Sequence, residues 1–279
     1  MKILKITVLF YLIPTLVFAK ISQQQKAALI DLYESTAGDK WHKSWDLKQP
    51  VSSWYGVSLE DNNVVALDLG FNNLNGQIPA SISDLIHLKV LNLSFNKLVG
   101  EWPSSITGMR NLEEIKLFSN EFSGSIPQDI GLLTNLKSLE IFNNNFTGEL
   151  PESMGNLTKL EVLIVSSNRL TGKLPQSISN LKALRVLSVF DNTFLGNIPD
   201  SIGELKALEE LVLSNNAFYG DLPDKLAELK NLKTLLLSKN QFKGNFAALK
   251  EQLPHIINFD ADESTTKNAV ATLDEENDD

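Results

Sequence analysis

Apolar and polar residues alternate along most of this chain in one frame that returns every 24 residues without insertion or deletion. Each copy starts with two aliphatic residues separated by one other residue, an alternation typical of a short strand with one buried face. The pairs are Leu67/Leu69, Leu91/Leu93, Ile115/Leu117, Leu139/Ile141, Leu163/Val165, Leu187/Val189, Leu211/Leu213 and Leu235/Leu237. A period of this length indicates a solenoid, because no single copy can bury its own apolar face and neighbouring copies must stack.

The remainder of each copy predicts how the chain turns. In the first copy, Asn72 follows the aliphatic pair, Gly76 and Pro79 come next, and Ile82 begins an apolar spacing of three residues that is typical of a 3₁₀ or short α turn. We expect the Asn amides to bind the backbone of their own and the neighbouring loop as a ladder. Leu or Phe stands two residues after each Asn, and the Phe side chains are expected to stack as a buried spine. The sequence therefore predicts an α/β repeat, with a parallel sheet on one side and 3₁₀ turns or short helices on the other.

The two ends of the chain depart from the repeat. Residues 1–19 place two lysines before a short apolar run, which predicts a signal peptide and a secreted protein, with an uncleaved N-terminal anchor as the alternative. Residues 20–63 are expected to form an N-terminal cap with an amphipathic helix and a hairpin strand. Residues 64–258 hold the eight repeats, and residues 259–279 are expected to form a C-terminal cap strand and an acidic disordered tail. We interpret Trp41, Trp45 and Trp54 as the core of the N-terminal cap, with a sugar-stacking platform as the alternative.

Composition narrows the possible partners. The formal charge of −9 becomes −11 once the two lysines of the leader are removed, which disfavours nucleic acid and membrane surfaces. The chain has no cysteine, so the exported protein must be stabilised by its core. No second apolar run is long enough to span a membrane, and the three histidines lie far apart in the sequence. We therefore expect no cofactor, no metal and no enzyme activity. Glycosylation sequons begin at Asn92, Asn145 and Asn156.

The repeat resembles the plant-type leucine-rich repeat, LxxLxxLxLxxNxLxGxIPxxIxx, from about Val64 to Asn258. The cap sequence from Val51 to Val57, VSSWYGV, is similar to the N-terminal caps of plant receptor ectodomains and polygalacturonase-inhibiting proteins. Leu59 stands where those caps carry a cysteine, and in this the chain is more similar to exported bacterial leucine-rich repeat proteins. The resemblance implies a right-handed curved solenoid with a concave parallel sheet and a convex side of 3₁₀ and short helices. It also implies protein, peptide or glycan partners on the concave sheet.

Outward positions of the predicted strands point to a binding surface. Five apolar residues are expected to form a strip on the middle repeats: Phe118, Phe142, Ile164, Val186 and Phe190. Its predicted edge is polar and consists of Lys116, Glu140, Asn143 and Asp191. Exposed aromatic residues with a polar rim are typical of an interface, although Phe or Ser at this position can equally be ordinary for the family.

The sequence thus favours a secreted, non-enzymatic recognition module that binds an extracellular protein or peptide on its concave face. The alternative is glycan binding, or inhibition of a polysaccharide-degrading enzyme. Adsorption to ice is a third class, and it requires a flat and regular array of similar side chains. The outward column Gly70, Ser94, Phe118, Phe142, Ser166, Phe190 is irregular.

Overall fold

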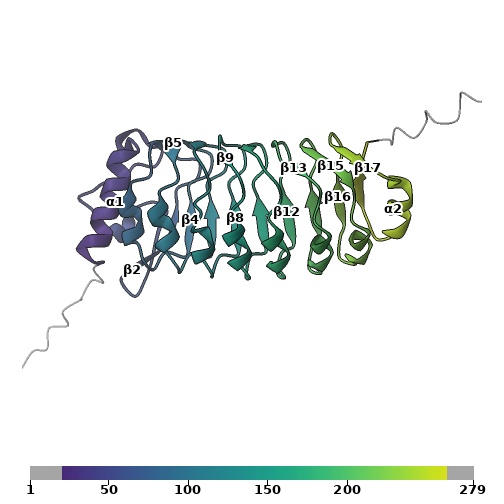
Figure 1. Cartoon of the computed structure of the whole chain (residues 1–279). Helices are drawn as coiled ribbons and strands as arrows, with labels where there is room; N and C mark the ends of the chain where they lie inside the picture. The colour runs from purple at the N-terminus through teal and green to yellow at the C-terminus, as the bar shows by residue number, and fades with distance from the viewer. Residues whose placement is uncertain (1–20, 263–279) are drawn as a thin grey trace, which may run out of the picture.

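Consecutive repeats stack side by side into an elongated solenoid (Figure 1). The computed structural model describes residues 21–262, so the predicted signal peptide and acidic tail lie outside the described residues. One ten-stranded sheet, here called the main sheet, runs the length of this part of the chain. Its strands are, in spatial order, β1 (Val57–Glu60), β2 (Asn63–Asp68), β4 (Val90–Asn92), β6 (Glu114–Lys116), β8 (Ser138–Glu140), β10 (Val162–Ile164), β12 (Val186–Ser188), β14 (Glu210–Val212), β16 (Thr234–Leu236) and β18 (Asn258–Asp260).

The register of the main sheet follows the sequence period. From β2 onward the strands are parallel, and each residue pairs with the one 24 positions later, as Leu91 does with Ile115. The strands from β2 to β16 end one residue before the second member of the aliphatic pair. That residue still bonds the neighbouring coil, since Leu93 donates its backbone N–H to Lys116 O at 2.8 Å. The predicted parallel repeat fold is therefore confirmed.

The opposite side of each coil carries the predicted 3₁₀ turns. They are η3 (Ala80–Asp84), η4 (Ser104–Gly108), η5 (Ile130–Leu132), η6 (Glu152–Asn156), η7 (Gln176–Asn180), η8 (Asp200–Glu204) and η9 (Asp224–Glu228). In all of these except η5, a Pro directly precedes the helix in extended conformation, where its missing N–H costs no hydrogen bond.

Short additional strands connect the main sheet to the 3₁₀ side. They form three small parallel sheets: β3 (Asn75–Gly76), β5 (Lys97–Glu101) and β7 (Glu121–Ser123); β9 (Thr147–Gly148) and β11 (Arg169–Leu170); β13 (Leu195–Gly196), β15 (Ala217–Asp221) and β17 (Gln241–Lys243). The repeat pattern of the sequence does not predict these strands. Each contains a Gly with positive φ, such as Gly148 at 77° in β9, or ends within two residues of one, and these strands are too short to show a clear alternating pattern of buried side chains.

The core is a continuous apolar column inside the coils. Phe122 and Phe146 are fully buried and stack with ring centroids 6.0 Å apart, as do Phe194 and Phe218. The predicted spine is confirmed, and stacked pairs of this kind contribute about 0.5–1.5 kcal/mol each beyond the burial of their area. Phe242 stacks on Phe218 but stays partly exposed, because β17 is the last strand of its sheet.

The predicted Asn ladder is also present. The Asn144 side chain donates to the carbonyls of Leu117 and Ile141, both at 3.1 Å. Its Oδ1 accepts the backbone N–H of Phe122 at 3.0 Å. Because the same contacts recur 24 residues apart, each amide ties its own turn to the preceding coil.

A helix and a tryptophan cluster close the N-terminal end of the solenoid. Helix α1 (Gln23–Ser35) starts after Ser22, whose hydroxyl accepts the N–H of Gln25 at 3.1 Å. Trp41, Trp45 and Trp54 are buried, and each indole N–H donates to a backbone carbonyl. The tryptophans therefore form core, and no ring surface is free for the sugar-stacking alternative. Strand β1 pairs antiparallel with β2 and covers that edge of the main sheet.

The C-terminal end has a different return segment. Helix α2 (Phe246–Gln252) stands where earlier repeats have a 3₁₀ turn, and Asn245 caps it by accepting the N–H of Ala248 at 3.0 Å. Strand β18 follows and pairs with β16, with Phe259 opposite Leu235. Among residues 21–262, no helix is long and apolar enough to cross a membrane.

Charges of alternating sign line the edge where the main-sheet strands begin. These residues are Lys89, Glu113, Lys137, Glu161, Arg185, Glu209 and Lys233, here called the charge ladder. Glu209 pairs with both neighbours, Arg185 and Lys233, at 2.7 Å each. Hydrogen bonds from Arg185 and then from Lys233 lower the pKa of Glu209 from 4.5 to about 2. Five of the seven ladder residues thus form ion pairs with a ladder residue of a neighbouring coil: Glu113 with Lys137, and Glu209 with Arg185 and Lys233.

Candidate functional site

The main sheet has one face whose side chains do not enter the core. We call this the open face; it comprises the outward residues of β2 to β16 and the two turn positions that precede each ladder Asn. The strands show the alternation that creates it, since Leu139 in β8 is buried while Ser138 and Glu140 on either side are half-buried. All nine sequence-predicted site residues lie at positions of this face.

The phenylalanines at the first turn position meet across neighbouring coils. Phe118 and Phe142 stack nearly parallel, with ring centroids 4.3 Å apart and an interplanar angle of 8°. Both rings are half-buried, because each covers part of the other. Parallel strands lie about 4.8 Å apart, so residues at one position of successive coils are spaced for direct ring contact.

Two further rings, which are not among the sequence-predicted site residues, extend this contact. Phe95 packs edge-on against Phe118 at 5.1 Å, and Phe71 stacks on Phe95 at 4.1 Å. The four rings of Phe71, Phe95, Phe118 and Phe142 form a continuous line across four coils, here called the aromatic row. Phe71 and Phe95 remain 70% and 43% exposed.

Phe71 and Phe95 occupy the second turn position, whereas Phe118 and Phe142 occupy the first. The second position has a left-handed backbone in every repeat, with φ of 56° at Phe71 and 53° at Phe95. This conformation costs an L-residue about 1–2 kcal/mol, and bulky side chains rarely adopt it. The sequence does contain a clue, because small residues, Gly70 and Ser94, precede the two rings.

Phe190 does not join the aromatic row. The coil between Phe142 and Phe190 carries Ser166 at the same position, and that hydroxyl is buried in a 2.7 Å hydrogen bond with Ser188. Phe190 is 39% exposed and makes no ring contact with another aromatic residue among residues 21–262. The predicted apolar strip is therefore divided.

Aliphatic residues occupy the middle of the open face beyond the row. Val162 of β10 lies opposite Val186 of β12, and Ile164 is two residues along from Val162. All three are half-buried. They form a smaller apolar patch, separate from the aromatic row.

Acidic residues gather beside the aromatic row on the same strands. Lys116 Nζ lies 3.1 Å from Glu114 and 3.9 Å from Glu140. The hydrogen bond with Glu114 raises the pKa of Lys116, and the charges of Glu140 and Asp68 add to this effect. Asp68 accepts a 2.8 Å hydrogen bond from Asn92. Two carboxylates thus contact a single ammonium group, and a third, Asp68, lies two strands away on the same face.

The other two polar residues of the predicted rim bind within the protein. Asn143 donates to Ser119 Oγ at 3.1 Å, and Asp191 accepts from Asn215 at 2.5 Å. Both contacts link neighbouring coils at the second turn position, so they hold the turns that carry the rings.

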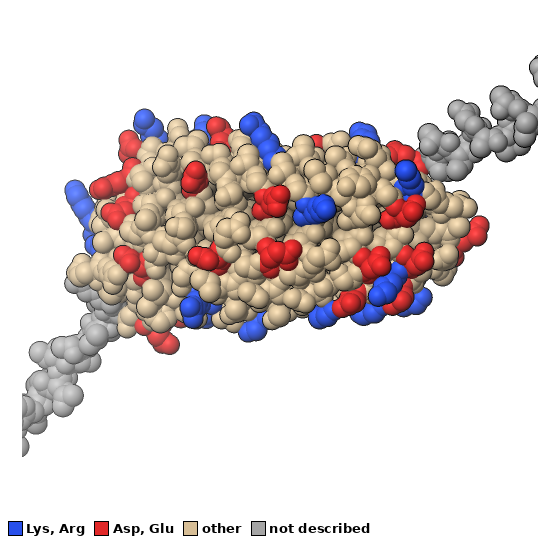
Figure 2. Space-filling view, viewed as in Figure 1, with Lys and Arg blue, Asp and Glu red and all other residues tan. Residues whose placement is uncertain are grey.

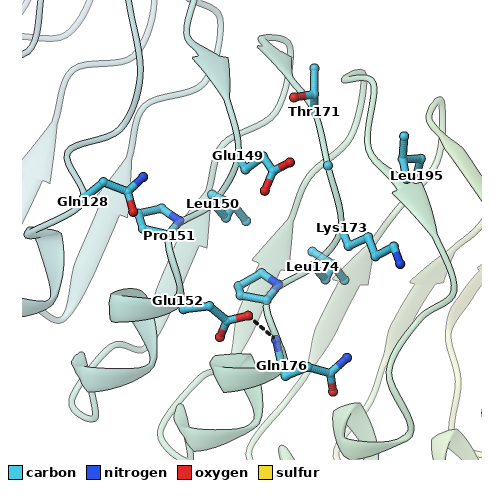
Figure 3. A pocket seen from close by; sticks show the side chains of 12 residues that line it. Gln128, Glu149, Leu150, Pro151, Glu152, Thr171, Lys173, Leu174, Gln176 and Leu195 are labelled. Carbon is cyan, nitrogen blue, oxygen red and sulfur yellow. Dashed lines mark hydrogen bonds between the residues drawn. The ribbon is translucent and has the colours of Figure 1, made fainter.

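A separate recess lies on the side of the solenoid that bears the small sheets (Figure 3). It has a volume of about 640 Å³ and is lined mainly by the Gly-x-Leu-Pro segments of two adjacent coils. Its Glu152 accepts the backbone N–H groups of Gln176 and Ser177 at 3.1 Å each. Hydrogen bonds from Ser177 and Gln176 lower the pKa of Glu152, whose charge therefore caps the start of η7. None of the predicted site residues lines this recess.

Neither surface groups metal-binding residues in the part of the chain that the structure describes. Within the described residues 21–262, no three His, Cys, Asp or Glu side chains are grouped so as to hold a metal ion. His255 bonds a backbone carbonyl, that of Leu229, at 2.9 Å. On the face drawn in Figure 2, acidic and basic side chains are scattered among wide neutral areas, so no single sign of charge covers it. The arrangement is suited to surface contact.

Two family models match the chain. One, described as a leucine-rich repeat region, matches residues 128–260, and another, described as leucine rich repeat, matches residues 62–122. No curated protein sequence matches.

Solved structures with the same fold include plant receptors and a bacterial protein. The ectodomain of the membrane receptor kinase GASSHO1/SCHENGEN3 from Arabidopsis thaliana, in complex with CASPARIAN STRIP INTEGRITY FACTOR 2, is 44% identical, with a TM-score of 0.63 over 64% of this chain and 22% of that one. The plant peptide hormone receptor RGFR1 in complex with RGF2 is 35% identical, with a TM-score of 0.64 over 66% of this chain and 30% of that one. The protein LIC12759 of Leptospira interrogans is 30% identical, with a TM-score of 0.58 over 68% of this chain and 47% of that one. The chain thus spans less than a third of either receptor.

Proposed function

Because the chain is a leucine-rich repeat protein, we propose that it is a secreted, non-enzymatic recognition module that binds an extracellular protein or peptide on the concave face of its main sheet. Similar solved structures are receptors, one of them a peptide hormone receptor in complex with RGF2. Secretion is part of the proposal and rests on the sequence of residues 1–19.

The observation that carries this proposal is the aromatic row. A solenoid gains nothing in stability from leaving Phe71 and Phe95 at 70% and 43% exposure, least of all in a left-handed backbone. Exposed aromatic residues beside polar groups are typical of interface positions that contribute most of the binding energy. A ligand that covered the row would remove this apolar area from water at about 25 cal/mol per Å².

Glycan binding, or inhibition of a polysaccharide-degrading enzyme, is the second candidate. Sugar rings stack on the flat faces of aromatic side chains. Phe118 and Phe142 cover each other's faces at 4.3 Å, and Phe95 meets Phe118 edge-on, so the row offers few free faces. Peptide side chains can contact ring edges as well as faces, and the geometry therefore favours a protein or peptide.

The test is selection from a displayed library of random 12-residue peptides on the chain without residues 1–19. Peptides recovered on the wild-type protein are then measured on Phe142→Ala, and truncation of a central ring should weaken binding by about 2 kcal/mol, or 30-fold. The matched control is Leu132→Ala, because Leu132 is 43% exposed on the 3₁₀ side, at the end of η5.

Two results would contradict the proposal. One is a set of selected peptides that bind Phe142→Ala as tightly as the wild type. The other is binding on a glycan array that depends on Phe142 when no selected peptide does, which would favour the second candidate.

A further inference from the structure

We infer that the ligand presents a cation, from Lys or Arg, between the aromatic row and the carboxylates of Asp68, Glu114 and Glu140. This inference rests on the proposed function and names the chemistry of its partner. The three carboxylates are called the acid trio below.

The charge balance beside the row is negative. Across β2, β4, β6 and β8 with their turn positions, the open face holds the acid trio and one basic residue, Lys116. Lys116 contacts Glu114 and Glu140, but its single positive charge does not balance the three negative charges of the trio. Asp68 and Glu140 otherwise accept hydrogen bonds from the neutral side chains of Asn92 and Ser138, so among residues 21–262 no second basic side chain pairs with the trio.

The same strands supply both the carboxylates and the rings. Glu140 precedes Phe142 by two residues, and Glu114 precedes Phe118 by four. Two residues along a strand span about 6.6 Å. A cation between Glu140 and Phe142 can lie within about 4 Å of a carboxylate oxygen and within about 6 Å of a ring centroid. These distances are the ranges of an ion pair and of a cation–π contact.

Lys116 already demonstrates that a cation is stabilised here. Its pKa is raised by the hydrogen bond with Glu114 and by the charges of Glu140 and Asp68. Its side chain is 32% exposed, and its ammonium group faces carboxylates that a ligand could also reach. Lys116 therefore competes with a cationic ligand and repels it, whereas it would attract an anionic one.

This competition gives two substitutions with opposite effects. Lys116→Met frees Glu114 and Glu140 and removes the repulsion, so it should tighten binding of a cationic peptide about two- to five-fold. Glu140→Gln should weaken the same binding by a similar factor. The matched control is Lys182→Met, which changes the net charge equally but removes an exposed lysine paired with Glu204 on the 3₁₀ side.

The probes are the peptides from the library described above that lose affinity on Phe142→Ala. We expect these peptides to be enriched in Lys and Arg relative to the starting library. Their affinity should fall between 50 and 500 mM NaCl, because exposed charge pairs are screened by salt.

The outcomes separate the two proposals. Peptides that depend on Phe142 but show no enrichment of Lys or Arg, or that bind Lys116→Met more weakly, would overturn the cation site and leave the proposed function standing. Peptides that never depend on Phe142 would overturn the proposed function, and the cation site with it. Tighter binding to Lys182→Met as well would assign the effect to net charge and contradict a local site.

Discussion

Replacement of Asn144 by Ala tests whether the ladder holds the coils together. The Asn144 side chain donates to the carbonyls of Leu117 and Ile141, and its Oδ1 accepts the N–H of Phe122. In the Asn144→Ala variant the carbonyl groups of Leu117 and Ile141 each keep another hydrogen-bond donor. Leu117 O also accepts from the Asn120 side chain at 3.0 Å, and Ile141 O accepts from the Asn168 side chain at 3.1 Å.

The Phe122 N–H is the group that the substitution leaves without an acceptor. Phe122 is fully buried, so water cannot replace the lost bond without opening the coil. An unsatisfied buried donor costs about 1–3 kcal/mol, and we expect Asn144→Ala to lower the free energy of unfolding by about 2 kcal/mol. Urea unfolding followed by circular dichroism measures this change, as a lower midpoint with an unchanged slope.

The matched control is Asn145→Ala in the next position. The Asn145 side chain makes no hydrogen bond to any of residues 21–262, and the same substitution there should change the free energy of unfolding by less than about 0.5 kcal/mol. If Asn144→Ala were no less stable than Asn145→Ala, the ladder would not be a source of stability and the reasoning from the orphaned N–H would be wrong.

Further predictions concern the two Phe columns and the charge ladder. Phe146→Ala should lower the free energy of unfolding by about 3–5 kcal/mol because its buried ring leaves a cavity, whereas Phe142→Ala should melt within a few degrees of the wild type and lose peptide binding. Equal thermal destabilisation of the two variants would contradict the assignment of Phe142 to the surface. The pKa of Glu209 is lower in the folded protein, about 2 against 4.5, so its ion pairs with Arg185 and Lys233 stabilise the fold above pH 4.5, and this contribution is lost as the pH falls toward 2. The melting temperature of Glu209→Gln should therefore lie below that of the wild type at pH 7 and converge with it near pH 2, and a constant difference between pH 7 and pH 2 would refute the linkage.

The repeating architecture follows from the sequence alone. A frame of 24 residues without insertions places Leu91 beside Ile115 and Asn120 beside Asn144 in the fold, because equal coils can stack only in that register. The buried spine of Phe122 and Phe146 follows for the same reason. Stacking of identical units converts a distance along the sequence into a neighbour in space.

The candidate site was only partly determined by the sequence. Strand alternation predicts which way Lys116 and Glu140 face, but this rule of period two ends where the chain enters the turn. Phe71 and Phe95 lie in that turn, where the backbone is left-handed. Phe71 stacks on Phe95, and Phe95 packs against Phe118, a contact between different positions of neighbouring coils. The tertiary structure likewise decided that the Ser166 hydroxyl bonds Ser188 and that Lys116 contacts both Glu114 and Glu140. These features depend on distances between side chains of different coils, which a one-dimensional period does not specify.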